Sequence, residues 1–563
     1  MKMKKLMIAL IGLSPWITLY AQKDSALHRT IVVENEYNPT VMDASKINVL
    51  PIVEEPTLAK KEAEYATAWR KIAAWDREPM VPIESRKKTE TAKRGYLKAG
   101  YGNYGNVCLG TGYLWDMTNA DRLKVDFALD GMNGNIPNKG FGRNGHWGAR
   151  HYTTDVKALY NHLFAPVSLN AGGNYTSQTF TYMGVKPTDA LSWDNRYRQR
   201  HTAGDFFVDV ASRDKELPFQ FRLQTGFQYF AQKHNPLEIS HENENGRSPS
   251  ENDDTAEKKI HATGDVWAES AEKQQIGIAF DVDHLRYSNS IMHNYTSVSL
   301  NPYYTLTDDV WRLRLGAHVD WFPGEKEGVD AAPNVKAEYI FSDSFILYAH
   351  ADGGRQLNEY RKLDGVSPYW VLKTWLQPTY TRLDATVGLR AAPLNGLWFN
   401  IYGGYRIRAH ETFAIPELIN RSYYGIVFLQ DKAKVPYVGA AWKYGYKDWF
   451  EVEMNASYFD WNIEGITGYE DEHVYAGKSK FIFDIDAKGK VYKGLTVGGG
   501  FYYVKRCGDF LNDVNDLHVG ADYEFLKHVA AFARIHNLMN KAYDMIGYPQ
   551  EKLNFLVGMK LRF

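Results

Sequence analysis

The last thirteen residues, 551-EKLNFLVGMKLRF-563, alternate apolar and polar side chains. Every second position from Leu553 onward is apolar: Leu553, Phe555, Val557, Met559, Leu561 and Phe563. The positions between them include Asn554, Lys560 and Arg562. Successive side chains of a β-strand point to opposite faces, so this period of two predicts a strand with one apolar and one polar face.

The same alternation recurs from residue 95 to the end of the chain. Clear examples are 123-LKVDFALD-130, 219-FQFRLQTGFQYFAQ-232, 397-LWFNIYGGYRIRAH-410 and 450-FEVEMNASY-458. Counting such segments predicts 22 strands, including 397–413 and 432–446 with a loop between them. A soluble β-sandwich or propeller is the alternative, because its strands also have one buried and one solvated face.

The lengths of the connections favour a membrane barrel over that alternative. Short turns such as 118-TNAD-121 and 393-PLNG-396 alternate with long loops such as 184-GVKPTDALSWDNRY-197. Outer-membrane barrels have short periplasmic turns and longer extracellular loops. We therefore expect residues 95–563 to form an all-β, 22-stranded antiparallel up-and-down outer-membrane barrel with both chain ends on the periplasmic side.

The first 21 residues have the features of a secretory signal peptide. Three lysines, Lys2, Lys4 and Lys5, precede the apolar stretch 6-LMIALIGLSPWITL-19, and the small residue Ala21 offers a cleavage site. The stretch is short for a membrane span and contains a proline, so an uncleaved anchor helix is the weaker alternative. Export through this peptide predicts that the protein reaches the outer membrane of a Gram-negative cell.

Composition limits the class of partner. The formal net charge is −1, which argues against nucleic acid, because a nucleic-acid-binding domain needs a strongly basic face. Aromatic residues make up 14% of the chain, with 38 Tyr, 27 Phe and 15 Trp. A membrane barrel uses many aromatic rings in its interfacial girdles, so outer-membrane lipid is the expected environment.

The C-terminal part of the chain resembles the barrel of the TonB-dependent receptor superfamily. The resemblance covers residues 95–563 and is carried by 536-HNLMNKAYDMIGYPQEKLNFLVGMKLRF-563, where Asn537-Leu538, Asn540-Lys541 and Gly547-Tyr548-Pro549 are similar to the last hairpin of that superfamily. It implies transport of iron complexes, cobalamin, sugars or peptides, energised by TonB. The aromatic C-terminus, Phe563, resembles the insertion signal that the barrel assembly machinery reads.

Residues 22–94 are too few for the plug domain that the resemblance implies. We expect this segment to be a periplasmic or luminal extension without a full plug. Within it, 30-TIVVENE-36 resembles a TonB box, an extended stretch able to add a strand to the sheet of a partner. TonB is therefore a possible partner.

The sequence contains only weak matches to catalytic or ligand-binding motifs. The stretch 100-GYGNYG-105 fits a dinucleotide-binding pattern, but it is followed by a strand where such a site needs a helix. The acidic loop 240-SHENENGRSPSENDD-254 lacks the spacing of a calcium loop, which leaves weak divalent binding as a minor alternative. We expect no enzymatic activity, no catalytic residue, no cofactor and no metal site.

Polar residues on the alternating strands are the candidates for the lining of a pore. They are Arg222, Gln224, Asn400, Arg406, Arg408, Glu451, Glu453, Asp484 and Asp486. Their mixed charge argues against selectivity for ions of either sign. Among the outer loops, 359-EYRKLDGVSPYWVLKTWLQPTY-380 is rich in aromatic and charged residues, which suit stacking on sugars or docking a protein; the interfacial girdle is the alternative.

Two functions follow from these expectations. The first is a plugless, receptor-like barrel that serves as a transport conduit. The second is a structural subunit of an outer-membrane assembly, whose lumen is filled by its own N-terminus or by an outer-membrane or periplasmic partner.

Overall fold

The computed structural model describes residues 94–138, 145–184, 196–214, 216–238, 255–289, 291–322, 328–342, 344–419, 423–447, 449–466, 468–475 and 477–563. The expected signal peptide and nearly all of the extension 22–94, with the TonB-box-like stretch 30–36, lie outside these residues. In the parts of the chain that are described, no helix is long and apolar enough to cross a membrane.

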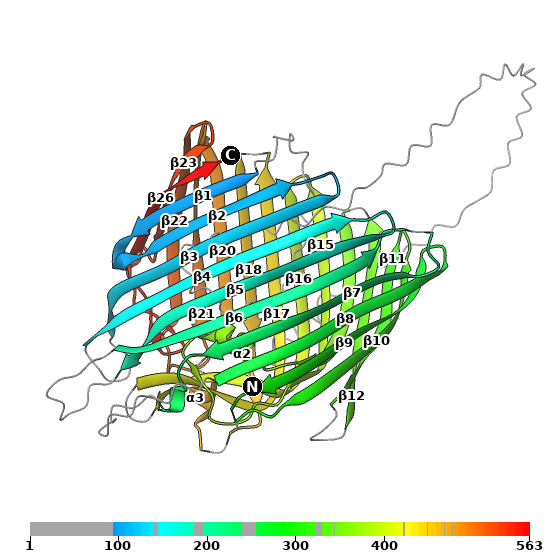
Figure 1. Cartoon of the computed structure of the whole chain (residues 1–563), viewed down its shortest axis with the longest axis horizontal. Coiled ribbons are helices and arrows are strands. Elements are labelled where there is room, and N and C mark those ends of the chain that lie inside the picture. Colours follow the sequence, from blue (N-terminus) through cyan, green and yellow to red (C-terminus); the bar gives the residue numbers. More distant parts are fainter. Residues whose placement is uncertain are drawn as a thin grey trace, which may run out of the picture. The chain divides into compact units, whose positions relative to one another are not determined.

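A closed antiparallel barrel of 22 strands forms the fold, as the sequence predicts (Figure 1). The wall strands are β1 (Gly95–Gly102), β2 (Val107–Asp116), β3 (Asp121–Asn138), β4 (Gly145–Leu163), β5 (Val167–Gly184), β6 (Arg196–Ser212), β7 (Gln220–Gln232), β8 (Thr255–Ala271), β9 (Gln274–Tyr287), β10 (Tyr295–Thr307), β11 (Trp311–Trp321), β12 (Val329–Ser342), β13 (Phe345–Gln356), β15 (Thr379–Leu394), β16 (Leu397–Ile419), β17 (Tyr423–Tyr446), β18 (Phe450–Phe459), β20 (Ser479–Tyr492), β21 (Leu495–Arg506), β22 (Val514–Leu526), β23 (Val529–His536) and β26 (Asn554–Arg562).

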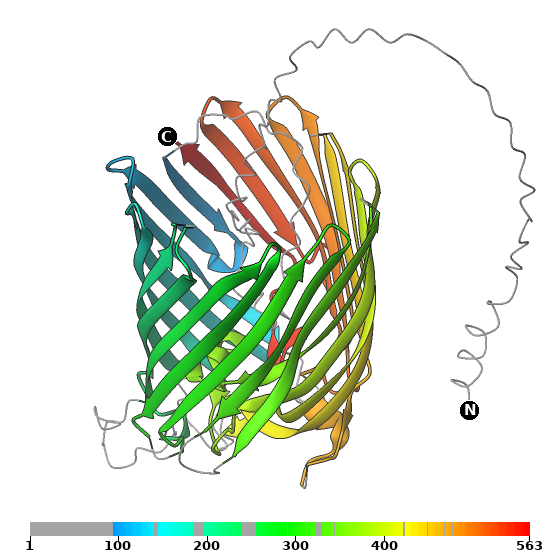
Figure 2. The ribbon, with the colours of Figure 1, turned by 90° about the vertical axis from the view of Figure 1, so that its right-hand side faces the viewer.

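The C-terminal strand closes the barrel against the first strand. β26 pairs with β1 on one side and with β23 on the other, and Figure 2 shows β1 and β26 side by side. The backbone N–H of Gly95 donates to the carbonyl of Phe563 at 2.7 Å, and the N–H of Phe563 donates to the carbonyl of Gly95 at 2.9 Å. These reciprocal bonds leave no unpaired sheet edge, which a membrane-spanning sheet requires.

The outer face of the wall is apolar. In β26 the side chains of Phe555, Val557 and Met559 are exposed, whereas Asn554 and Leu556, on the opposite face, are buried. Exposed apolar residues recur at alternate positions of other strands, for example at Leu223 and Phe227 in β7. An apolar outer surface of this kind suits the hydrocarbon of a bilayer.

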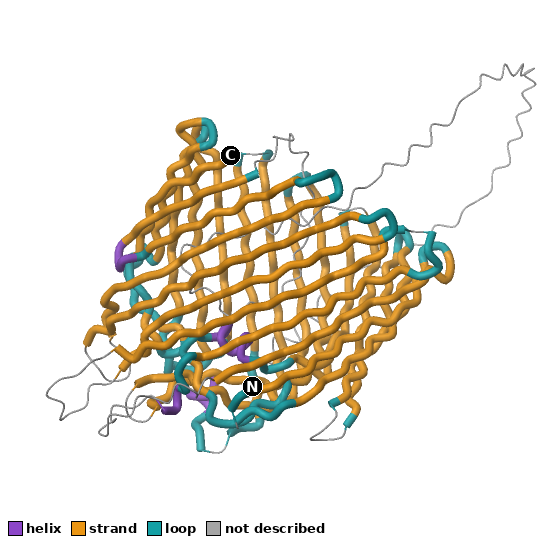
Figure 3. Tube along the Cα trace, viewed as in Figure 1, coloured by secondary structure: helices purple, strands orange, loops and turns teal. Residues whose placement is uncertain are grey.

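Short elements lie in the connections at the end of the barrel away from the C-terminus (Figure 3). They are α2 (Tyr360–Val366), β14 (Trp370–Val371), β19 (Asn462–Ile463), α3 (Asp471–Tyr475), β24 (Asp544–Met545) and β25 (Tyr548–Pro549), with 3-10 turns η1 (Asn103–Gly105) and η2 (Pro236–Glu238). We call this end the loop end and the other the turn end.

The β16–β17 hairpin differs from the expectation. Its strands run to Ile419 and start again at Tyr423, so most of the predicted loop 414–431 is strand. The tip leaves the wall and pairs with β5 through Tyr423–Gly184 and Tyr424–Met183. β5 is the fifth strand of the wall and β17 the sixteenth, so eleven strands separate them in either direction around the wall of 22. The hairpin therefore spans the mouth of the barrel from one side to the other.

Burial explains why the sequence pattern failed there. Ala414, Ile415, Ile426, Val427 and Phe428 are all buried, so consecutive residues of the hairpin tip are apolar. A strand that is buried on both faces loses the alternation that identifies a half-buried strand.

Candidate functional site

Three segments pack together at the loop end of the barrel. They are the β13–β15 connection (357–378) with α2 and β14, the tip of the β16–β17 hairpin, and the β23–β26 connection (537–553) with β24 and β25. We call these segments together the cap. β14 pairs in parallel with β17, so the first segment extends the hairpin that crosses the mouth.

Aromatic side chains form the interior of the cap. Tyr360, Tyr369, Trp370, Tyr423 and Tyr548 are each at most 1% exposed. They share one apolar core with side chains of the wall, including Met132, Trp147, Phe180, Phe230 and Leu285. That core therefore joins the three segments to the wall along the arc of strands from β3 to β9.

Two tyrosines join the loops at the centre of this core. The rings of Tyr369 and Tyr548 are stacked, with centroids 3.6 Å apart and planes inclined by 6°. The indole of Trp147, in β4, meets both rings edge-on at 5.9 and 5.3 Å. The hydroxyl of Tyr548 donates to the carbonyl of Tyr424 in the hairpin tip. This set of contacts links all three segments of the cap to the wall.

Ion pairs and hydrogen bonds join α2 to strands β5 and β6 on the other side of the mouth. Arg361 forms an ion pair with Asp205 of β6, with Nη1 2.6 Å from Oδ2, and donates through Nη2 to Asn174 of β5 at 3.0 Å. Asp364 lies 2.7 Å from Nδ1 of His201 in β6.

A second set of polar contacts joins the start of α2 to β8. The ammonium of Lys259 lies 2.6 Å from Oε2 of Glu359, and the buried carboxylate of Glu257 accepts the backbone N–H of Tyr360 at 2.9 Å. Partly buried pairs with additional hydrogen bonds hold geometry better than exposed pairs do. The cap is thus fixed by directional contacts as well as by apolar packing.

One lysine of the cap is partly buried among other charged groups. Burial lowers the pKa of Lys362, in α2, to about 8, with Arg408 and Lys478 adding to the effect and Glu411 opposing it. Its ammonium donates to Oδ1 of Asn358 at 2.7 Å. The closed cap therefore carries an unfavourable charge at neutral pH.

The predicted pore-lining residues are distributed over four strands and do not converge on one site. Arg222 and Gln224 are in β7, Asn400, Arg406 and Arg408 in β16, Glu451 and Glu453 in β18, and Asp484 and Asp486 in β20. In β7 and β16 they occupy the strand face opposite exposed apolar residues such as Leu223 and Ile401.

Most of the charged members of that set have an ionic or hydrogen-bonding partner on another strand or, in the case of Arg408, on the same strand. The closest contacts are Arg222–Asp209 at 2.8 Å, Arg406–Asp384 at 2.5 Å, Arg408–Glu411 at 2.9 Å, Glu451–Lys443 at 2.9 Å, Glu453–Lys443 at 3.9 Å and Asp486–His518 at 2.7 Å. Asn400 accepts a hydrogen bond from the hydroxyl of Tyr348 at 2.9 Å. The pairing leaves a polar surface with little excess of either charge.

The expectation for the loop 359–380 is wrong in one respect. Tyr360, Tyr369 and Trp370 are buried in the cap, so they present no ring to a sugar or a protein partner, and they are no part of an interfacial girdle. The reason is that the loop folds back over the mouth, which sequence alone does not indicate. The loop segments 139–144 and 185–195 lie outside the described residues.

The C-terminal aromatic residue lies at the turn end. Phe563 is 54% exposed, and its ring stacks on that of Tyr113 with centroids 6.1 Å apart. Its role as an insertion signal stays a prediction.

Comparison with known proteins identifies the fold. No family model matches the sequence, and no curated protein is similar to it. Among solved structures, the chain is similar to a ferric enterobactin receptor from Pseudomonas aeruginosa in complex with enterobactin, with 11% identity over 85% of this chain and 82% of that chain, and a TM-score of 0.62.

Two further structures give the same result. The FrpB iron transporter from Neisseria meningitidis has 9% identity over 84% of this chain and 83% of that chain, with a TM-score of 0.62. The siderophore receptor PiuA from Acinetobacter baumannii has 12% identity over 85% and 82%, with a TM-score of 0.57. These neighbours are receptors and a transporter, not enzymes. At such identities the likeness concerns the fold, and the chain therefore has the barrel fold of Gram-negative outer-membrane receptors.

Proposed function

We propose that this protein is a receptor-like transport conduit of the outer membrane whose outer mouth is closed by its own cap. The observation that carries the proposal is the pairing of the β17 tip with β5, on the opposite side of the wall, over a buried aromatic core. Passage through the barrel then requires the cap to move.

The inner wall supports this proposal. In our proposal Arg222, Gln224, Asn400, Arg406, Arg408, Glu451, Glu453, Asp484 and Asp486 line the path. Since most of the charges in this set are paired across strands, the path would discriminate weakly between anions and cations. A polar solute of either sign fits such a wall better than a highly charged one.

The N-terminal part completes the proposal on sequence grounds. Residues 1–21 direct export, residues 22–94 form a periplasmic or luminal extension without a full plug, and Phe563 directs insertion by the barrel assembly machinery. Contact of TonB with residues 30–36 would supply energy for import.

A disulfide lock across the mouth tests the role of the cap. Met183 and Tyr424 are directly paired, and paired antiparallel residues have Cα atoms about 4.5–5.5 Å apart, which suits a disulfide. To keep the two native cysteines from reacting with the introduced pair, the lock is made as Met183→Cys with Tyr424→Cys in a Cys108→Ser, Cys507→Ser background. The readout is ion conductance of the full chain in planar bilayers.

The control is a cysteine pair within the wall. Ala171 and Val208 are partners in β5 and β6, so Ala171→Cys with Val208→Cys makes a disulfide that does not touch the cap. We expect the oxidised lock to be silent, its reduced form to open intermittently, and the control to behave alike in both states. Equal conductance of the lock in both states would exclude the cap as the gate, and silence throughout would exclude a conduit.

The closed mouth also suits a second function. A barrel that needs no open path could be a structural subunit of an outer-membrane assembly, with its lumen filled by residues 22–94 or by a partner protein. Native mass spectrometry after mild detergent extraction separates the two. A stoichiometric companion protein supports the structural subunit, and a lone chain supports the conduit.

A further inference from the structure

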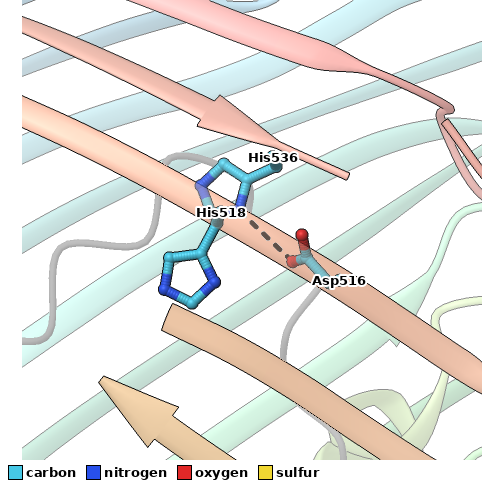
Figure 4. Close-up of side chains that lie close together, drawn as sticks. All are labelled: Asp516, His518 and His536. Carbon is cyan, nitrogen blue, oxygen red and sulfur yellow. Dashed lines mark hydrogen bonds and ion pairs between the residues drawn. The ribbon is translucent and has the colours of Figure 1, made fainter. Parts of the chain in front are cut away.

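Two histidines and an aspartate meet on the polar face of the wall, outside the cap (Figure 4). Asp516 and His518 are two residues apart in β22, so they share a strand face, and His536 ends β23. Val519 pairs with Ile535 and Gly520 with Arg534, and the same register places His518 opposite His536. One ligand atom from each of the three side chains lies within 4.8 Å of the other two.

Two ligand atoms of this cluster have the spacing of a zinc site, and the ligand atom of His518 lies within 4.8 Å of both. Oδ2 of Asp516 and Nδ1 of His536 are 3.3 Å apart, and the two imidazole rings lie with centroids 5.5 Å apart. Ligands held about 2.0–2.1 Å from a tetrahedral zinc ion are about 3.3 Å from each other. An ion can therefore be accommodated between these two side chains without separating them.

His518 offers a free lone pair to the cluster. Its Nε2 lies 2.7 Å from Oδ1 of Asp486, and a carboxylate only accepts, so Nε2 carries the proton. The other nitrogen, Nδ1, is buried and has no hydrogen-bond partner among the described residues. A buried acceptor without a partner is costly, and a metal ion would satisfy it.

Asp486 is placed to orient the imidazole ring of His518. Metal-binding histidines commonly donate their second N–H to a carboxylate, which fixes the tautomer and the ring orientation. Asp516 is similarly held, because its Oδ1 accepts the backbone N–H of Asn537 at 2.7 Å while Oδ2 faces His536. Its side chain is only 2% exposed, so a dication would also compensate a buried negative charge.

We propose that Asp516, His518 and His536 bind a divalent transition-metal ion, with zinc as the best fit. Two imidazoles and one carboxylate are typical ligands of zinc, whereas calcium and magnesium prefer oxygen alone. Three protein ligands leave a coordination position for water or another small ligand. Because Asn537 begins the connection that carries Tyr548, the ion would also tie β22 and β23 together at the base of the cap. The site is independent of any transport activity.

Zinc binding by the purified full-length chain tests the site. The protein in detergent is stripped with a chelator and dialysed against Zn²⁺, and bound metal is measured by elemental analysis. We expect one zinc per chain, loss of that zinc in His518→Ala and in His536→Ala, and retention in the control His284→Ala, which alters a histidine of β9 outside the cluster. Absence of stoichiometric zinc from the unaltered protein, or equal uptake by the ligand variants, would overturn the proposal.

A milder variant tests the site even if substitution of a ligand prevents folding. Asp486→Asn keeps all three ligands and weakens only the support of His518, so we expect zinc affinity to fall about 10- to 100-fold. Heat-modifiable migration on gels reports whether each variant is folded. Unchanged affinity in a folded Asp486→Asn protein would contradict the assignment of His518 Nδ1 as a ligand. Co²⁺ substitution provides a second readout, since tetrahedral nitrogen and oxygen coordination gives a visible absorption band that the His518→Ala protein would lack.

Discussion

Removal of the Tyr548 side chain should release the cap while leaving the wall intact. The ring is 1% exposed, stacks on Tyr369 with centroids 3.6 Å apart, and meets Trp147 edge-on at 5.3 Å. Truncating a buried aromatic side chain to alanine costs about 3–5 kcal/mol, part of which is the aromatic pairing. The wall strands keep all their hydrogen bonds, so this loss falls on the equilibrium between closed and open cap.

The expected size can be measured by hydrogen exchange. A loss of 3–5 kcal/mol raises the open fraction by a factor of about 10² to 4 × 10³, because each 1.4 kcal/mol is tenfold. Backbone amides in α2 and β14 of Tyr548→Ala should therefore exchange faster by up to that factor, until the cap is fully open, whereas amides in the wall, for example in β10, should be unchanged.

Tyr548→Phe is the matched control. It keeps the ring and loses only the hydrogen bond to the carbonyl of Tyr424, worth about 1 kcal/mol, so exchange in the cap should rise only about fivefold. Unchanged exchange in the cap of Tyr548→Ala would refute the reasoning that this ring holds the segments together. An equal rise in cap and wall would show that the cap is not a separate cooperative unit.

Three further predictions follow from the same structure. Burial lowers the pKa of Lys362 to about 8 from 10.5, so protonated Lys362 destabilises the closed cap by about 3 kcal/mol below pH 8, and this penalty fades as the pH rises from 8 to 10.5. Subtilisin should therefore cleave the loop 357–378 faster in the unaltered protein than in Lys362→Met at pH 7, and at a similar rate in both at pH 10. A ratio of the two cleavage rates that does not change with pH would contradict this prediction. Arg406→Gln removes the positive charge 2.5 Å from Asp384 and leaves that carboxylate only the hydroxyl of Tyr437, so it should lower the free energy of unfolding by about 3 kcal/mol, measured by urea titration. Part of the loss should be recovered in Arg406→Gln/Asp384→Asn, and no recovery would mean that the pair itself is not responsible. Deleting residues 23–90 should not sensitise cells to large antibiotics, because in our proposal the cap closes the mouth. The same deletion combined with Tyr548→Ala should sensitise them. Sensitivity caused by the deletion alone would mean that the extension, and not the cap, is the barrier.

Much of the barrel could be predicted from sequence because a membrane wall imposes a local rule. Each strand must present apolar side chains to lipid and polar side chains to the interior, so the pattern can be recognised from a few neighbouring residues, as in Leu553 to Phe563. Strand number and closure then follow from counting. The residues proposed for the polar face, such as Arg406 and Glu451, were found in the same way, although their partners Asp384 and Lys443 lie on other strands and were not.

The cap and the histidine cluster depend on contacts that the sequence does not encode locally. Tyr369 and Tyr548 are 179 positions apart in the chain and yet stack face to face, and the tip of β17 pairs with β5 across the mouth. Likewise, Asp516 and His518 lie two residues apart on one strand, which did not single them out as a site, and only the register of β22 against β23 brings His536 to them. The sequence by itself thus determined the strands and their two faces, since that choice is made residue by residue against lipid and water. The tertiary structure alone decided that the hairpin tip crosses the mouth and where side chains converge, because both result from packing between segments that are distant in the chain.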